Sequence, residues 1–244
     1  MRMEPIKIDE KNVKMIAHRG LSGVEVENTR DAFILATKYS YYGIETDVHV
    51  TLDGKYIICH DDSTLRVSGI DMIIEESHYE ELRKIKIINK DNTFSKEMYL
   101  PNLEEYINIC KSGNKFAVLE LKNEMKEANI IEIVNIIKEM NYYDKTIFIS
   151  FSKENIVNLR KLFNDSSCQF LSVVDTKEKM EDALNFAIQY KCNLDLHYKG
   201  ITKEFVNECH QNNILLNVWT IDDEAVAKEL IDMGVDFITS NILE

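Results

Sequence analysis

Short apolar runs and longer amphipathic runs alternate along nearly the whole chain. The apolar runs are rich in β-branched and aromatic residues, as is typical of buried strands. We expect strands over residues 15–17, 44–50, 56–59, 116–121, 147–151, 170–174, 193–196, 215–219 and 237–239. In the amphipathic runs the apolar residues recur about every 3.6 positions, the period of a helix with one buried face. We expect helices over residues 29–39, 103–110, 128–140, 154–162, 177–190, 203–211 and 224–233.

This alternation predicts a parallel sheet whose strands are joined by crossover helices. About eight such units in 244 residues is the size and rhythm of a (β/α)8 TIM barrel, an α/β fold. An open, doubly wound sheet is the alternative, but no glycine-rich phosphate loop follows any of the expected strands. Only residues 240–244 follow the last expected strand, so we expect the last helix to be short or missing.

One stretch, residues 61–98, breaks the rhythm because it is polar and irregular, with a weak helical pattern only over residues 80–85. We expect it to be a small insertion after the second strand unit, on the loop face of the barrel. Long loops in compact domains often form the walls of a substrate site. The sequence therefore predicts a single domain over residues 1–244 that contains this insertion.

Composition and charge narrow the classes of partner. The formal net charge of −13 argues against binding to nucleic acid, which requires a basic face. A small phosphate substrate remains compatible with this charge, because a metal ion and a few cations can reverse the field locally. No apolar run is long enough to span a bilayer, and residues 1–14 lack the apolar core of a signal peptide. We expect a cytoplasmic protein without a transmembrane segment; the sequence does not indicate its oligomeric state.

Ionisable side chains gather where the expected strands end. In a TIM barrel the active site forms at the carboxyl ends of the strands. The residues that stand out there are His18, Arg19, Glu45, Asp47, His60, Glu120, Lys122 and Trp219. Few structural roles require so many charged groups at these positions, so we expect them to form one site.

Three of these residues are candidate metal ligands. Glu45 and Asp47 lie two residues apart on one strand and so point to the same face, and Glu120 ends another strand. An acidic pair on a strand can also serve in salt bridges, but the third carboxylate favours a shared cation, which relieves the mutual repulsion. Oxygen ligands without cysteine favour one divalent Mg²⁺ or Ca²⁺ ion, with Mn²⁺ as a further option.

The remaining candidates fit acid–base chemistry and binding of a phosphorylated substrate. His18 and His60 are the candidate general acid and base, because imidazole titrates nearest to neutral pH. Arg19 can hold two phosphate oxygens and Lys122 can supply a mobile positive charge. Trp219 can form the wall for an organic group, although core packing explains a tryptophan equally well. The sequence does not indicate which histidine is the base.

At this point the chain resembles the glycerophosphodiester phosphodiesterase family over nearly its whole length. The resemblance is carried by His18-Arg19-Gly20, Glu27-Asn28-Thr29, Glu45-Thr46-Asp47, His60-Asp61, Leu100-Pro101-Asn102-Leu103, Glu120-Leu121-Lys122, Ser150-Phe151 and Val218-Trp219-Thr220. It implies a TIM barrel with a small insertion, and hydrolysis of glycerophosphodiesters to glycerol 3-phosphate and an alcohol. It also implies that Glu45, Asp47 and Glu120 bind a divalent metal, that His18 and His60 act as acid and base, and that Arg19 holds phosphate.

The chain departs from the family pattern in places that line the rim of the expected pocket. Val26 replaces a proline, Ile149 replaces a glutamine, and residues 65–68 and 239–242 also differ. Two alternatives remain. A lysophospholipase D would need an apolar groove, and an acidic surface suits anionic membranes poorly. A barrel that binds a phosphorylated metabolite without catalysis would need to have lost a histidine or a metal ligand, and none is lost.

Overall fold

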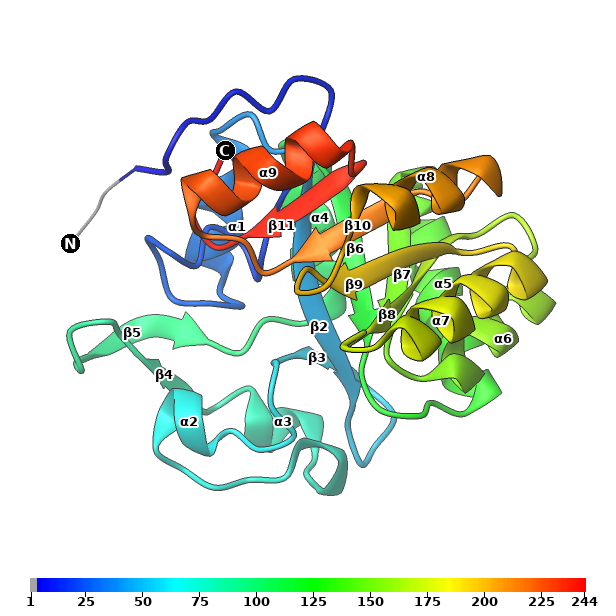
Figure 1. Ribbon diagram of the computed structural model, residues 1–244. Helices are drawn as coiled ribbons and strands as arrows, with labels where there is room; N and C mark the ends of the chain where they lie inside the picture. The colour runs from blue at the N-terminus through cyan, green and yellow to red at the C-terminus, as the bar shows by residue number, and fades with distance from the viewer. Residues whose placement is uncertain (1–3) are drawn as a thin grey trace.

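Eight parallel strands close into a barrel in the computed structural model, which describes residues 4–244 except for the side chains of residues 95–97 (Figure 1). The strands are β1 (Lys14–Ala17), β2 (Gly43–Val50), β6 (Phe116–Leu121), β7 (Thr146–Ser150), β8 (Ser167–Ser172), β9 (Asn193–His197), β10 (Leu216–Trp219) and β11 (Phe237–Ser240). Each pairs with the next in this order, and β1 pairs with both β2 and β11. The predicted TIM barrel is confirmed.

Amphipathic helices cover the outside of the barrel (Figure 1). They are α1 (Arg30–Thr37), α4 (Leu103–Ser112), α5 (Glu127–Glu139), α6 (Lys153–Leu162), α7 (Lys177–Tyr190), α8 (Lys203–Gln211) and α9 (Glu224–Met233), with the short helix η2 (Tyr143–Lys145) before β7. These bounds follow the predicted ones to within a few residues. In α5 the residues at helical spacing, Ile130, Ile133 and Ile137, are fully buried against the sheet. At the beginning of α4, Asn102 and Glu105 form a capping box.

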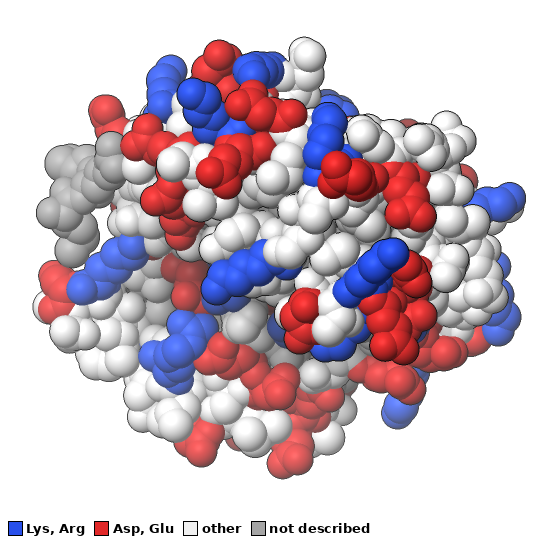
Figure 2. All heavy atoms as spheres, viewed as in Figure 1, with Lys and Arg blue, Asp and Glu red and all other residues white. Residues whose placement is uncertain are grey.

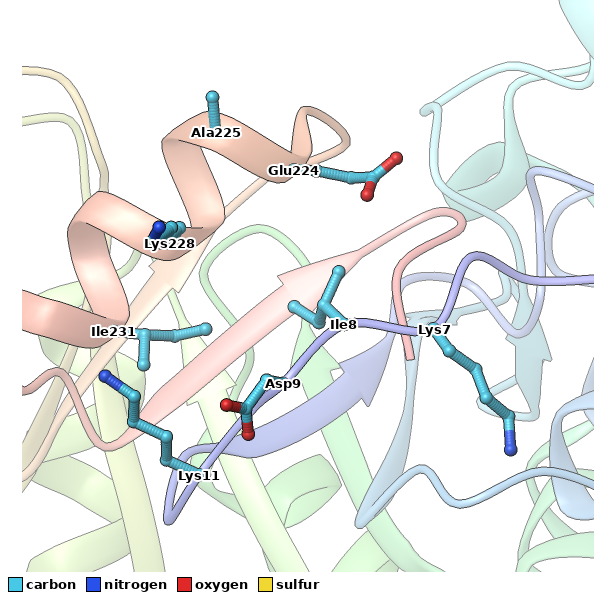
Figure 3. Close-up of a pocket in the computed structure, with 8 residues that line it drawn as sticks. All are labelled: Lys7, Ile8, Asp9, Lys11, Glu224, Ala225, Lys228 and Ile231. Atoms are coloured by element: carbon cyan, nitrogen blue, oxygen red, sulfur yellow. The ribbon is translucent and has the colours of Figure 1, made fainter.

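No helix follows β11 in residues 241–244; an extended segment from the beginning of the chain lies beside them instead. Ile6 and Leu243 form a parallel bridge, and the Ile6 amide donates to the Ile242 carbonyl over 2.8 Å. The same segment runs past α9 and leaves a cavity of about 530 Å³ on the outside of the barrel, in which Ile8 and Ile231 form the apolar part (Figure 3). The charged residues that line this cavity lie at the protein surface; Lys11, for example, forms an exposed ion pair with the neighbouring Asp232.

The insertion is more ordered than the sequence pattern suggested. In the structure it extends over residues 56–100: the expected strand β3 (Tyr56–Ile58) is followed by α2 (Leu65–Ser68), η1 (Ile74–Glu76), α3 (Tyr79–Leu82), β4 (Lys86–Ile88) and β5 (Phe94–Tyr99). Its own hydrophobic core consists of Ile57, Cys59, Ile74, Leu82, Ile85, Ile87, Met98 and Leu100. The expectation of an irregular segment was wrong because elements of three to six residues are too short to show a period.

The third expected strand is not part of the parallel barrel. β3 runs antiparallel to β2, with Val50 opposite Tyr56 and Val48 opposite Ile58. On its other side β2 pairs with β6 along most of its length. Its pairing with β1 is limited to Gly43 and Ile44, at the beginning of the strand. The insertion therefore enters the sheet between the carboxyl ends of β1 and β2, at the mouth of the barrel.

The inside of the barrel has an apolar and a polar part. The apolar part contains Ile16, Val118, Ile147, Ile149, Leu171 and Phe237, which pack as one buried cluster. The polar part contains Gln169, Asp195, Asn217 and Thr239, all at most 3% exposed, in addition to the acids on β2 and β6. Barrel interiors are usually filled with branched apolar side chains, so the polar part indicates a site. None of the described helices has the length and apolarity that crossing a lipid bilayer requires.

Candidate active site

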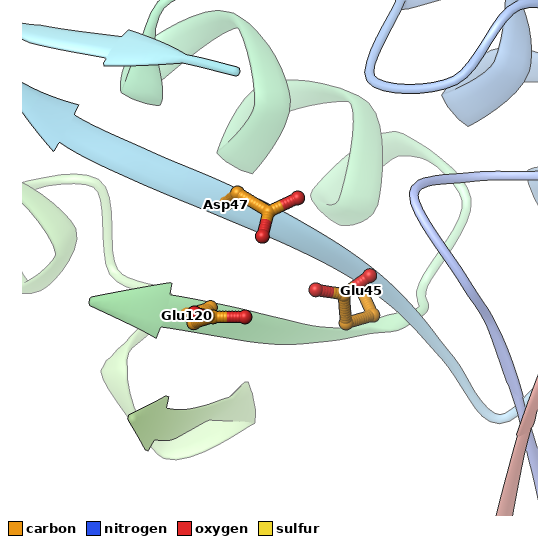
Figure 4. Close-up of side chains that lie close together, drawn as sticks. All are labelled: Glu45, Asp47 and Glu120. Carbon is orange, nitrogen blue, oxygen red and sulfur yellow. The ribbon is translucent and has the colours of Figure 1, made fainter. Parts of the chain in front are cut away.

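Glu45, Asp47 and Glu120 converge inside the mouth of the barrel (Figure 4). Glu45 and Asp47 come from β2, and Glu120 lies opposite Asp47 on the neighbouring strand β6. Each is at most 6% exposed, and one oxygen of each lies within 4.8 Å of one oxygen of the other two. The parity of the two acids on β2 and the parallel pairing with β6 together produce this convergence.

The electrostatics of the three acids fit a cation. Burial, and then the charge of Asp47, raise the pKa of Glu45 well above its usual range and that of Glu120 to about 8. Burial also opposes ionisation of Asp47, but the ammonium of Lys122 at 3.6 Å and the guanidinium of Arg19 at 3.7 Å hold its pKa below the usual value. Asp47 Oδ1 is buried and has no hydrogen-bond partner. An oxygen-only donor set with an unpartnered buried oxygen fits Mg²⁺, Ca²⁺ or Mn²⁺.

The loop after β1 holds these acids in place. Gly20 has a φ of +77°, and a Cβ there would lie 2.7 Å from the backbone of Ala32, so a glycine lets this loop pack against α1. Asn28, further along the loop, donates to Asp47 Oδ2 over 2.8 Å and accepts from the Thr46 hydroxyl over 2.7 Å. In the sequence, Asn28 stood out only as part of the family resemblance. Its structural role is this pair of hydrogen bonds, which a sequence pattern cannot reveal.

His18 lies directly after β1 with one ring nitrogen toward the acids. Its Nδ1 is 2.7 Å from Asn241 Oδ1, and its Nε2 is 4.0 Å from Glu45 Oε2. Asn241 donates through Nδ2 to Asp222 over 2.6 Å, which fixes its oxygen toward the histidine. Nδ1 of His18 therefore carries the proton and Nε2 is free to accept one. Burial, and then the charge of Arg19, lower the pKa of His18 to about 4, so the imidazole is neutral.

His60 reaches the site from the insertion. We expected it at the end of a parallel strand, but β3 runs back down beside β2, and the Cys59 amide donates to the Asp47 carbonyl over 3.1 Å. His60 Nδ1 is 2.7 Å from Asp61 Oδ1. The Asp61 carboxylate in turn accepts from Arg66 over 2.6 Å, and this bond holds the pKa of Asp61 below its usual range. His60 thus has an anionic partner, whereas His18 has a neutral one.

The two predicted phosphate-binding cations are both held by acids. Arg19 donates to Glu27 over 2.8 Å, in addition to its contact with Asp47. The ammonium of Lys122 lies 3.0 Å from Glu120 and 3.6 Å from Asp47, although Lys122 is not among the residues that line the cavity described next. Both cations therefore lie beside the acids.

A cavity of about 260 Å³ joins these groups at the mouth. It is lined by His18, Arg19, Glu45, His60, Glu120, Ile149, Phe151, Leu171, Asp195, Trp219 and Thr239. The ring of Trp219 packs edge-on against Phe151, with 5.8 Å between the ring centroids. Six of the eight predicted site residues line this cavity, and the other two, Asp47 and Lys122, contact the residues that do.

Two residues of the site were missed by sequence reasoning. Asp195 lies between Leu194 and Leu196 on β9, and this alternation could have indicated a side chain that points into the barrel. Asn241, which orients His18, follows the last strand. No local pattern identifies it, because its partners Asp222 and His18 are distant in sequence.

The chain is similar to known proteins over most of its length. Residues 18–243 match the model of the glycerophosphoryl diester phosphodiesterase family. An uncharacterized protein of Mycoplasma genitalium is 30% identical over 86% of this chain and 87% of its own length. A glycerophosphodiester phosphodiesterase of Caldanaerobacter subterraneus is 28% identical over 93% of each chain. The crystal structure of a glycerophosphodiester phosphodiesterase from Parabacteroides distasonis has a TM-score of 0.77 and 28% identity, covering 94% of this chain and 93% of that one. The chain belongs to the glycerophosphoryl diester phosphodiesterase family and is a phosphoric diester hydrolase.

Proposed function

We propose that the protein hydrolyses glycerophosphodiesters to glycerol 3-phosphate and an alcohol by metal-dependent acid–base catalysis. The observation that carries the proposal is the meeting of three buried carboxylates and two histidines at one cavity. The name of the Caldanaerobacter relative supports the substrate class.

Glu45, Asp47 and Glu120 would hold one divalent cation, Mg²⁺, Ca²⁺ or Mn²⁺, which when bound offsets charge on the phosphate and acidifies a bound hydroxyl. Arg19 would bind a phosphate oxygen beside it. Lys122 would supply a second positive charge once its acids are shared with the cation. The faces of Trp219 and Phe151 would form the wall for the organic part of the substrate.

The partners of the two histidines support different roles for them. His18 would be the base, because it is neutral and its free Nε2 faces the acids, where it can take the proton from the attacking oxygen. His60 would be the acid that donates a proton to the leaving alkoxide, with its ring oriented by the hydrogen bond between Nδ1 and Asp61.

The test is an assay of glycerol 3-phosphate release from the glycerophosphodiesters of choline, ethanolamine, glycerol and inositol, with each of the three cations. His18→Ala and His60→Ala should each lower kcat by about 10²- to 10⁴-fold, while calorimetric cation binding stays near the wild-type value. Glu45→Gln should weaken cation binding instead. Full activity in both histidine variants, or activity indifferent to EDTA, would overturn the proposal.

A further inference from the structure

Of the four polar residues in the barrel interior, Gln169, Asn217 and Thr239 hydrogen-bond to one another. The Asn217 amide donates to Thr239 over 3.1 Å and to Gln169 over 3.4 Å, and the Thr239 hydroxyl donates to Asn217 Oδ1 over 3.2 Å. These contacts account for the polar side chains of β8, β10 and β11 without any ligand. The fourth residue, Asp195, lies on the strand between them.

Asp195 is left with an unpaired oxygen that belongs to the cavity wall. It lies in register between Leu171 of β8 and Asn217 of β10, and it is 2% exposed. Its Oδ1 is buried and has no hydrogen-bond partner, and the residue lines the cavity at the barrel mouth. A buried polar atom without a hydrogen-bond partner is destabilising. A ligand that pairs with this oxygen is the best explanation for a buried acid here.

The environment of Asp195 bears on the kind of ligand. Burial, and then the charge of Glu120, raise its pKa well above the usual range and so favour the protonated, uncharged carboxyl. A neutral carboxyl both donates and accepts a hydrogen bond. It therefore suits a hydroxyl group, which also does both, and it does not repel the phosphate of the same substrate.

The shape of the cavity indicates which end of the substrate meets Asp195. Asp195 lies opposite Leu171 on β8, and Ile149 and Leu171 of the cavity lining are at most 5% exposed, so this part of the cavity is closed. Phe151, which directly follows β7 at the mouth, is 47% exposed. The alcohol that differs between glycerophosphodiesters needs the open end, and the constant glycerol fits the closed one.

We propose that Asp195 is a specificity-determining residue that hydrogen-bonds a hydroxyl of the substrate's glycerol. The proposal rests on the proposed function, and it goes further by naming the residue that recognises the polyol. The indole of Trp219 helps to place it, since Nε1 donates to the Asp195 carbonyl over 3.2 Å.

The test compares kcat/KM for glycerophosphocholine with kcat/KM for its two monodeoxy analogues, each lacking one glycerol hydroxyl. The wild type should prefer glycerophosphocholine to at least one analogue by about tenfold or more, because a site that hydrogen-bonds a hydroxyl rejects a ligand without it. Asp195→Leu should bring that ratio near one by losing activity on glycerophosphocholine alone. Asp195→Asn keeps a donor and an acceptor and should retain most of the preference.

Gln169→Leu is the matched control, because Gln169 belongs to the polar group of β8, β10 and β11 and, unlike Asn217, does not lie opposite Asp195. It removes a buried polar side chain of the same layer that does not line the cavity, so it should change activity on all three substrates by the same factor. A wild type without preference, or an Asp195→Leu variant with the wild-type ratio, would overturn the assignment of Asp195. A wild type that hydrolyses no glycerophosphodiester would instead overturn the proposed function, so the two failures are distinguishable.

Discussion

At the scale of single residues, a chain of ion pairs joins two proposed functional groups that come from different segments. Arg19 contacts Glu27, Glu27 accepts two hydrogen bonds from Arg66, and Arg66 also holds Asp61, the partner of His60. The isolated contribution of each exposed pair to stability is small. Their value lies in orientation, because they fix His60 and Arg19 relative to each other.

Replacing Arg66 by leucine should therefore impair catalysis more than stability. We expect kcat to fall about tenfold with little change in KM, since second-layer partners of catalytic groups have effects of about 10- to 100-fold. Arg66→Lys should restore only part of kcat, because lysine cannot fork to two carboxylates at once. Steady-state kinetics and thermal unfolding measure both effects.

Arg30 provides the control for this experiment. It is also about half-exposed and paired with an acid, Glu105, but it lies on α1 outside the cavity. Arg30→Leu should leave kcat unchanged. An equal loss of kcat in the two variants would show that the Arg66 network has no special role.

At the scale of elements, sequence periodicity predicted the barrel and failed in the insertion. Helices such as α5 bury a regular stripe, and barrel strands are short apolar runs, so both leave a pattern in the sequence. The insertion is held together by contacts among elements too short to be periodic. For the same reason His60, which lines the cavity, was expected after the wrong kind of strand.

The small core of the insertion supports the proposed acid of the reaction. Leu82 is fully buried in it, and Leu82→Ala should cost about 2–5 kcal/mol of local stability. Because His60, Asp61 and Arg66 all belong to this segment, kcat should fall at 25 °C, and limited proteolysis should cut the insertion first.

Ile137→Ala is the matching change in the main barrel core, where Ile137 is also fully buried. It should lower the Tm of the whole protein and leave kcat near the wild-type value. If both variants keep full activity, the insertion does not support the site in the way described.

At the scale of the whole molecule, the 42 acidic side chains outnumber the 29 lysines and arginines. In Figure 2 lysines and arginines are scattered among acidic side chains, in keeping with the net charge of −13. Inside the mouth Arg19 and Lys122 are paired with acids, so a bound divalent cation is needed to make the field there positive. We therefore expect the anionic substrate to be attracted by the site when it holds the cation.

The same site should couple cation binding to pH. Glu120 has a pKa of about 8 without the cation, well above its value in an unfolded chain, so the metal-free fold loses stability as the pH rises from about 4.5 to 8. A cation must displace that proton, so its affinity should rise by up to about tenfold per pH unit below pH 8. The increase in Tm caused by Ca²⁺ or Mg²⁺ should therefore be larger at pH 8.5 than at pH 6.

Calorimetric unfolding with and without the cation measures this coupling. Glu120→Gln should flatten the pH dependence, because the titrating ligand is gone. A cation-induced increase in Tm that is the same at pH 6 and pH 8.5 would contradict the raised pKa of Glu120.

Besides the ion pairs of Arg66, backbone hydrogen bonds between β2 and β3 join the insertion to the barrel. At its carboxyl end, β2 is hydrogen-bonded to β6 on one side and to the insertion on the other, with β1 out of reach. Whenever the insertion opens, the strand that carries Asp47 is left with one neighbour, and its amide hydrogens become free to exchange with solvent. Deuterium uptake at residues 48–50 and in the insertion should thus rise and fall together, and a bound cation should slow both.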